Sequence, residues 1–419
     1  MWYIWRIHRD DFFGLKTWRG NGRNQCPKRR IYVFRKSQKS VFFEDVNMTG
    51  KKKSGTSSRQ SLIMAIDGGG SSTKIIGGLN FVLRSVIAME PEMIQVPREL
   101  LSEYDAGVLP KDCAWVGLGG KYLAVGYLAR CQATVTPMLS QPKMSLAIPK
   151  IAAAVWVLKE MFNLPSQLRL SLATVLPPGE YKDKDNLESA LKEALKVFET
   201  PTGKMRVNLV EFDCKPEGGG LFMYHKAKRG KENIYNTNVA VVMLGYRNIS
   251  TLVFNRGKKG EYLTTDLGFA KFIRGVIKET AGYNDQSLTP ALALYGDGRS
   301  DEPLTKVLRY RDKADKEDEL IRLKKAIVAV RRQYEIQVAN WLTDVLPPDV
   351  GEVLLCGGTA DYLKKMLFEL FSDKDIYLHA KLTMPDDIQE WGMGNRWADI
   401  WCIWDYFCGV VPSTPSVVA

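Results

Sequence analysis

The feature that most constrains this chain is a hydrophobic segment, residues 61–67, that ends in an aspartate and leads into three glycines. SLIMAID is typical of a buried strand, and TKIIGGL, shortly after the glycines, is typical of a second strand. Because glycine tolerates positive φ and close approach of a ligand, we expect Gly68, Gly69 and Gly70 to form a tight, left-handed turn. The backbone N–H groups of such a turn bind anions. The sequence therefore predicts a β-hairpin that binds phosphate.

The residues around these glycines can supply ligands to a phosphate group and its metal ion. The hydroxyl groups of Ser71, Ser72 and Thr73 can donate hydrogen bonds, and Lys74 can reach a phosphate. Asp67 is placed to hold a hydrated Mg²⁺ ion that accompanies a nucleotide. A Walker A loop and a Rossmann dinucleotide site are excluded, because both need a helix after the glycines and an apolar strand follows here.

A second glycine pair, Gly357 and Gly358, follows the apolar strand EVLLC at 352–356. Thr359 or the next residue opens a predicted helix at 360–371, whose N-terminus carries a positive dipole. Such a turn would let a flat base or a ribose rest on the backbone. By itself it could equally be an ordinary connection between a strand and a helix, but together with the first hairpin it becomes a partner motif.

Between these motifs, strands alternate with helices, which predicts an α/β protein. The chain of 419 residues is longer than a single core usually allows, so we expect two domains. Further strands are expected at 168–176, 205–212, 239–244 and 249–254, and helices at 150–163, 185–199, 268–281 and 315–346.

The order of these motifs resembles that of the actin, Hsp70 and sugar-kinase superfamily, and most closely that of the plasmid-segregating actin-like ATPases, the ParM/StbA family. AIDGGGSSTK is similar to the first phosphate hairpin of that family, and LLCGGTAD to its adenosine motif. TVLPPGEYKD at 174–183 and TTDLGFAKFIRGV at 264–276 are shorter matches. In CKPEGGG, Glu217 stands where the family has the glutamate that orients the hydrolytic water.

The resemblance implies a two-lobed actin-like (ribonuclease H-like) ATPase fold with ATP and Mg²⁺ in the cleft between the lobes. Residues 61–236 and 397–419 would form lobe I, and residues 237–396 lobe II. It also implies self-association into filaments that segregate plasmid DNA or other cargo, with a DNA-bound adaptor protein as a further partner.

The family pattern breaks at the second phosphate hairpin, which usually carries an aspartate. In VVMLGYRNISTLVF, residues 241–254, Met243 occupies the aspartate position, Gly245 is retained, and Arg247 and Asn248 replace small turn residues. Methionine cannot ligate Mg²⁺ or order water, so we expect slow ATP hydrolysis that depends on Glu217. Arg247 could contact a phosphate directly or could be a solvated turn residue.

Two other functions remain open. A scaffold that binds nucleotide without hydrolysing it is favoured by Met243. A small-molecule kinase of the same fold is suggested because I-D-G-G-G also resembles the hairpins of BadF and N-acetylglucosamine kinases. Such a kinase needs a carboxylate base beside the acceptor hydroxyl, and the sequence shows no Asn-Asp pair in a suitable turn between a strand and a helix.

The net charge of +12 is concentrated at the start of the chain. Residues 1–59 contain 15 Lys and Arg against four Asp and Glu, a net charge of +11, which leaves +1 for the remainder. We expect residues 1–60 to be a disordered basic arm and linker, unless the natural start is Met48. Any direct contact with nucleic acid would be made by this arm.

The cysteines and the apolar segments indicate a cytoplasmic protein that does not bind membranes. Seven scattered cysteines without a C-x-x-C pair predict free thiols in a reducing compartment, and three histidines give no sign of a zinc site. The longest apolar stretch, residues 397–411, is interrupted by Asp399 and Asp405 and is too short to span a bilayer.

Overall fold

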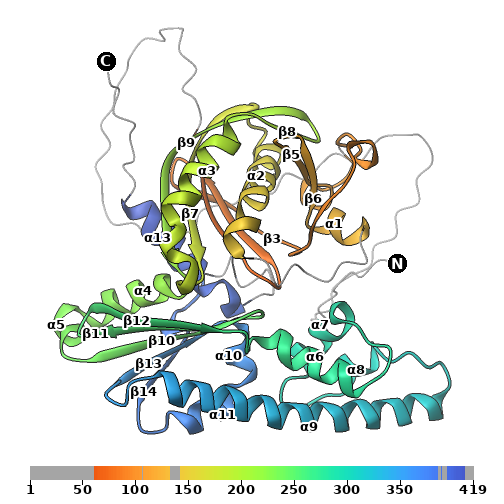
Figure 1. Ribbon diagram of the computed structural model, residues 1–419, viewed down its shortest axis with the longest axis vertical. Coiled ribbons are helices and arrows are strands. Elements are labelled where there is room, and N and C mark those ends of the chain that lie inside the picture. Colours follow the sequence, from red (N-terminus) through yellow and green to blue (C-terminus); the bar gives the residue numbers. More distant parts are fainter. Residues whose placement is uncertain (1–60, 106, 133–141, 386–387, 389–393, 411–419) are drawn as a thin grey trace, which may run out of the picture. The chain divides into compact units, whose positions relative to one another are not determined.

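Two β-sheets with helices on their faces make up the described part of the chain (Figure 1). The computed structural model describes residues 61–105, 107–132, 142–385, 388 and 394–410. All of them belong to the second of two compact units, Ser57–Ala419. The basic arm predicted at 1–60 lies outside the described residues.

The first sheet brings the ends of three parallel strands to one edge. Its nine strands run in the order β3-β2-β1-β7-β9-β8-β5-β6-β4. β1 pairs antiparallel with β2 and parallel with β7, which pairs parallel with β9. Asp67 in β1 and Glu217, just after β9, therefore lie at the same edge. The strands are β1 Ser61–Gly68, β2 Thr73–Leu79, β3 Val82–Met89, β4 Met93–Gln95, β5 Trp115–Leu118, β6 Lys121–Val125, β7 Gln167–Leu176, β8 Phe198–Thr200 and β9 Gly203–Pro216.

The second sheet repeats the core of the first, with five strands in the order β12-β11-β10-β13-β14. As in β3-β2-β1-β7-β9, three strands form antiparallel hairpins and the next two run parallel to the central one. Each sheet thus presents a hairpin turn beside the end of a parallel strand. The strands are β10 Asn238–Leu244, β11 Ile249–Asn255, β12 Lys258–Thr265, β13 Glu352–Cys356 and β14 Asp375–Leu378.

The helices form layers around the two sheets (Figure 1). α2 and α3 cover one face of the first sheet, α4 and α13 pack between the two sheets, and α6, α9 and α11 cover the outer face of the second. The helices are α1 Tyr127–Gln132, α2 Lys143–Phe162, α3 Lys184–Lys196, α4 Gly219–Arg229, α5 Lys231–Tyr235, α6 Phe269–Glu279, α7 Asp285–Tyr295, α8 Glu302–Thr305, α9 Lys313–Val345, α10 Gly358–Tyr362, α11 Lys364–Leu370 and α13 Ala398–Val410, with short 3-10 turns that include Gly394–Trp397.

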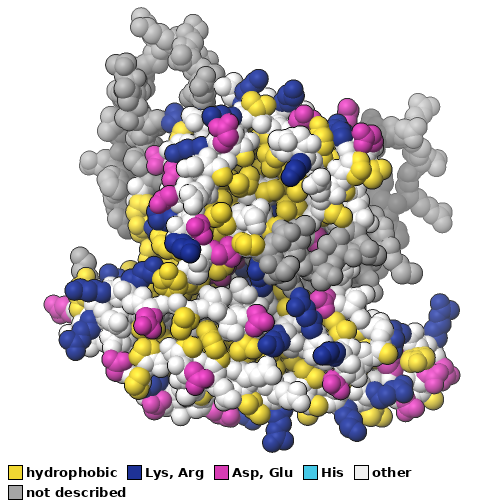
Figure 2. All heavy atoms as spheres, in the orientation of Figure 1, with side chains coloured by type: hydrophobic (Ala, Val, Ile, Leu, Met, Phe, Trp, Pro, Cys, Tyr) yellow, Lys and Arg dark blue, Asp and Glu magenta, His cyan; other side chains and the backbone are white. Residues whose placement is uncertain are grey.

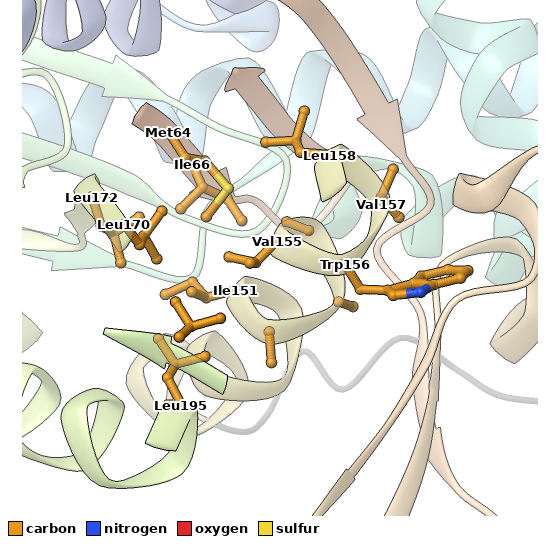
Figure 3. Close-up of a cluster of buried hydrophobic side chains, with 14 of the residues drawn as sticks. Met64, Ile66, Ile151, Val155, Trp156, Val157, Leu158, Leu170, Leu172 and Leu195 are labelled. Atoms are coloured by element: carbon orange, nitrogen blue, oxygen red, sulfur yellow. The ribbon is translucent and has the colours of Figure 1, made fainter. Parts of the chain in front are cut away.

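Helix α2 is buried against the first sheet and carries two lysines to its edge. Ile151 and Val155 face β1 and β7 in the hydrophobic cluster of Figure 3. Burying side chains of this size contributes about 1.5–3 kcal/mol each, which offsets the roughly 3 kcal/mol cost of Pro149 inside the helix. The helix therefore starts at Lys143, before the predicted residue 150, and presents Lys143 and Lys150 two turns apart on one face.

A buried ion-pair group, the Glu352 cluster, joins α4 to β13. The Glu352 carboxylate contacts the Nε2 of His225 at 2.6 Å and the Nη2 of Arg229 at 2.5 Å. Burial lowers the pKa of His225 despite this carboxylate. Because Glu352 and His225 are almost fully buried, the cluster ties the helix layer between the sheets to the second sheet.

The predicted α/β class is confirmed. The strands predicted at 168–176, 205–212, 239–244, 249–254 and 352–356, and the helices at 185–199, 268–281 and 315–346, are present with shifts at their ends. The helix predicted at 360–371 is interrupted at Leu363, which separates α10 from α11. The lobe boundaries at residues 236 and 396 stay predictions.

The surface of the described residues mixes both signs of charge. On the face shown in Figure 2, acidic and basic side chains are interspersed, in keeping with the small net charge of the chain after residue 59.

Among the described helices, none combines the length and the apolar character needed to cross a membrane.

Candidate functional site

A cleft of about 330 Å³ is lined by turns from both sheets. The turn between β1 and β2, the turn between β10 and β11, and the turn from β13 into α10 all reach it. Its volume lies within the range of about 300–1,000 Å³ that is usual for small-molecule sites. Three motifs that are far apart in the sequence are thus brought to one place.

Most of the residues predicted for the site line this cleft. They are Asp67, Gly68, Gly69, Gly70, Ser71, Lys74, Glu217, Gly245, Arg247, Asn248, Gly357, Gly358 and Thr359. Ser72, at the end of the loop, and Thr73, at the start of β2, are buried and do not line it, and the Thr73 hydroxyl has no hydrogen-bond partner among the described residues. Their role as hydroxyl donors to a ligand stays a prediction.

The glycine turn of the first hairpin differs from the prediction. None of Gly68, Gly69 and Gly70 has a positive φ, so the left-handed turn was wrong. Residues 69–72 form a four-residue loop, a length that is usually built around a right-handed type I turn. Space is tight at Gly69, since a Cβ there would lie 3.0 Å from the backbone oxygen of Ser72, whereas a Cβ on Gly68 would make only ordinary contacts with Lys150 and Lys143.

Lys143 joins the two carboxylates at the edge of the first sheet. Its Nζ lies 2.6 Å from Oδ1 of Asp67 and 2.7 Å from Oε1 of Glu217. Lys74 donates to the other oxygen of Asp67 at 2.7 Å. Burial alone would raise the pKa of Asp67, but the two ammonium groups hold it well below its usual range. Burial would likewise lower the pKa of Lys143, and the carboxylates hold it above its usual range.

These carboxylates do not fit the Mg²⁺ ion expected at Asp67. Mg²⁺ is held by oxygen ligands in near-octahedral geometry, whereas both oxygens of Asp67 accept hydrogen bonds from lysines. Met243 lines the cleft from the second hairpin and offers no oxygen. Within the ranges that the structure describes, no three His, Cys, Asp or Glu side chains are grouped to hold a metal ion. The two carboxylates at this place instead accept hydrogen bonds from the ammonium groups of lysines.

Lys150 lines the cleft but belongs to none of the sequence motifs. It is 3% exposed, lines the cleft beside Gly68, and forms no hydrogen bond or ion pair with any residue that the structure describes. Burial, together with repulsion from Lys143, lowers the pKa of Lys150 to about 8. Two lysines seven residues apart in the otherwise apolar segment KMSLAIPKIAAAVWVL were the available signal.

Arg396 lies between the first hairpin and the turn from β13 into α10, and its place in the cleft was not predicted either. Its Nη2 donates to the hydroxyl of Ser71 at 2.6 Å. Its side chain passes beside Gly358, where an added Cβ would lie 3.2 Å from the Cγ of Arg396. Burial lowers its pKa. One arginine side chain thus reaches the hairpin of the first sheet with its guanidinium group and lies beside the turn of the second with its aliphatic part.

Asp399 holds the segment that carries Glu217. Its carboxylate accepts hydrogen bonds from the N–H groups of Gly218 at 2.9 Å and Leu221 at 3.2 Å, at the start of α4. Burial raises the pKa of Asp399 to about 6. Gly218 has a φ of 85°, and a Cβ there would lie 2.8 Å from the Cγ1 of Val241. Gly218 is therefore required by its backbone conformation and by packing.

Aromatic side chains from the elements around the second sheet also line the cleft. Tyr246, Phe269 and Tyr362 line it, and the rings of Phe269 and Tyr362 meet edge to face with centroids 4.9 Å apart. Thr359 donates its hydroxyl to the backbone oxygen of Gly245 at 2.9 Å, which joins the two turns of the second sheet. The cleft is therefore lined by lysines from the elements around the first sheet and, from those around the second, by aromatic rings suited to contact a flat ring.

Comparison with known proteins identifies the fold. No protein family model and no curated protein matches the sequence. Solved structures do match: the actin-like protein Alp7A (13% identity, 84% of this chain and 96% of that one, TM-score 0.58) and the archaeal actin homologue Ta0583 in complex with ADP (15%, 82% and 98%, 0.52). A non-polymerisable quadruple mutant of pCBH ParM is also similar (14%, 83% and 98%, 0.53). The described part of the chain has the actin-like fold, as the motif order predicts.

Proposed function

We propose that this chain is an ATP-binding actin-like protein whose nucleotide state controls its assembly into filaments. The observation that carries the proposal is the convergence of three turns on one cleft that is lined by ammonium and guanidinium groups and by aromatic rings. That combination suits a nucleotide, which has charged phosphates and a flat base. The archaeal homologue that shares the fold was solved with ADP, which supports this choice of ligand.

Assembly would follow from closure of the two sheets around the nucleotide. A ligand that binds a closed conformation better than an open one shifts the population toward it and so alters the surfaces by which subunits stack. We further propose that the filaments move plasmid DNA or other cargo through a DNA-bound adaptor. Direct contact with nucleic acid would involve residues 1–60, where most of the positive charge of the chain lies.

Hydrolysis would be slow and would depend on Glu217. Its carboxylate lines the cleft and could orient a water molecule toward the phosphates, although Lys143 already engages one of its oxygens. Because Met243 supplies no second carboxylate, water activation would rest on a single group.

The test is assembly of the full chain with ATP, with ADP and without nucleotide, followed by light scattering and electron microscopy beside phosphate release. We expect filaments with ATP and fewer with ADP. Filaments that form equally without nucleotide would contradict the switch. Failure to bind either nucleotide would contradict the proposal as a whole.

A scaffold that binds nucleotide without hydrolysing it is the second candidate. Met243 and the ion pair between Lys143 and Glu217 both favour it, because they leave little to activate water. Persistent ATP binding with no phosphate release would select this function over a filament ATPase that turns over.

A further inference from the structure

We propose that the cleft binds its nucleotide as the metal-free polyphosphate, with the ammonium groups of Lys143 and Lys150 in place of Mg²⁺. This inference rests on the proposed nucleotide binding and specifies the form of the ligand: a nucleoside di- or triphosphate without a divalent cation. Its starting point is the disagreement between the expected metal ion and the side chains that line the cleft.

The first step is the position of Lys143. Its ammonium group lies between Asp67 and Glu217, the two carboxylates at the edge of the first sheet, and only 7% of the residue is exposed. Both oxygens of Asp67 are engaged, by Lys74 and Lys143, so a hydrated cation that bridged the two carboxylates would have to displace Lys143. Removing one partner from a buried ion pair is strongly unfavourable, because it leaves the other charge uncompensated. Lys143 thus already supplies the positive charge at this place.

The second step is the unpaired charge of Lys150. Its side chain lies against the first hairpin, where a Cβ on Gly68 would be 3.6 Å from its Cδ, and it forms no hydrogen bond or ion pair with any residue that the structure describes. Asp67 and Glu92 attract it through space only. A buried ammonium group without a hydrogen-bonded counter-ion is costly. A cleft that retains one is suited to a ligand that brings the missing anion.

The third step is the distribution of charge along the cleft. Three further carboxylates line the cleft, and each has a partner: Asp297 pairs with Arg331 at 3.1 Å, Asp361 lies 2.9 Å from the Nε2 of His379, and Asp399 accepts hydrogen bonds from the N–H groups of Gly218 and Leu221. Lys74 and Lys143 match Asp67 and Glu217, so Lys150 and Arg396 add two positive groups against the one negative group of Asp399. A metal-free polyphosphate carries more negative charge than its Mg²⁺ complex and needs such a surplus.

The test is equilibrium binding of ATP and ADP to the full chain, measured by titration calorimetry in EDTA and again with Mg²⁺. We expect binding in EDTA at least as tight as with Mg²⁺. Binding only with Mg²⁺ would overturn this inference and leave the proposed function standing. No binding in either buffer would overturn both.

Lys150→Met should weaken ATP binding in EDTA about tenfold or more, the loss expected for a hydrogen bond between charged groups. Lys159→Met is the matched control, because Lys159 lies on the same helix, pairs with Glu160 and does not line the cleft. Equal affinities for the Lys150→Met variant and the control would overturn the role of Lys150. Thermal unfolding of both variants checks that each is folded.

Asp67→Asn gives a second, independent outcome. The amide keeps the size of the side chain but removes a negative charge that repels phosphate, and it releases Lys74 and Lys143 from one ion-pair partner. We expect ATP affinity in EDTA to stay the same or rise. A fall of tenfold or more that appears only with Mg²⁺ would show that Asp67 serves a metal ion, and would refute the inference.

Discussion

Gly357 and Gly358 look interchangeable in the sequence, yet the structure places different constraints on them, and alanine at each position tests this. Gly357 has φ 94° and ψ 162°, a region that is essentially restricted to glycine. A Cβ at Gly357 would also overlap the backbone oxygen of Leu244, which is held in β10 between β11 and β13. Gly358 has no positive φ, and its Cβ would meet only the flexible side chain of Arg396.

The expected magnitudes follow from these contacts. The backbone conformation costs an alanine at Gly357 about 1–3 kcal/mol, and an overlap that forces a shift of the backbone costs roughly another 1–3 kcal/mol. Gly357→Ala should therefore lower the free energy of unfolding by about 2–6 kcal/mol, a large part of the roughly 5–15 kcal/mol of a typical domain. Gly358→Ala should change it by less than about 1 kcal/mol, since alanine is favoured in a helix.

Equilibrium urea unfolding, followed by circular dichroism, measures both variants. Nucleotide titration of the Gly358→Ala variant should show weaker binding, because the new methyl group displaces Arg396 from the cleft. Equal unfolding midpoints for Gly357→Ala and the parent would refute the steric reasoning. A large loss of stability in Gly358→Ala would show that the two glycines share one structural role.

Three further changes test the remaining parts of the site and fold. Glu217→Gln should lower phosphate release by about 10²–10⁴-fold without lowering ATP affinity; release at the parental rate would exclude Glu217 as the group that orients water. Because burial and Lys143 bring the pKa of Lys150 to about 8, Lys150 loses its charge as pH rises, so ATP affinity should fall between about pH 7 and pH 9. The Lys150→Met variant should lack that fall, and an identical pH profile in both proteins would contradict the assignment. Glu352→Ala removes the acceptor at the centre of the Glu352 cluster and should cost about 3–5 kcal/mol of stability in urea unfolding, whereas a cost below about 1 kcal/mol would show that water replaces the carboxylate.

Much of the fold was predictable because its signals are local. The strand SLIMAID, its glycine turn and the strand TKIIGGL specify a hairpin through neighbouring residues alone, and so does the strand that leads into Gly357. Their order was enough to predict the actin-like fold. The conformation of the turn was harder to predict from the sequence. The left-handed turn expected at Gly68, Gly69 and Gly70 was wrong, because the length of the loop and its approach to the Ser72 backbone decide its geometry.

What only the tertiary structure decided is the charge balance of the cleft. In the sequence, Lys143 and Lys150 stand out only as two charges in an apolar segment, and Arg396 lies more than 300 residues from the hairpin it contacts. The burial of α2 against the first sheet places the two lysines beside Asp67 and Glu217. Sequence motifs report the backbone turns that surround a ligand. Which charges face it depends on helix packing, because electrostatic interactions act between groups that only the folded chain brings within a few ångströms.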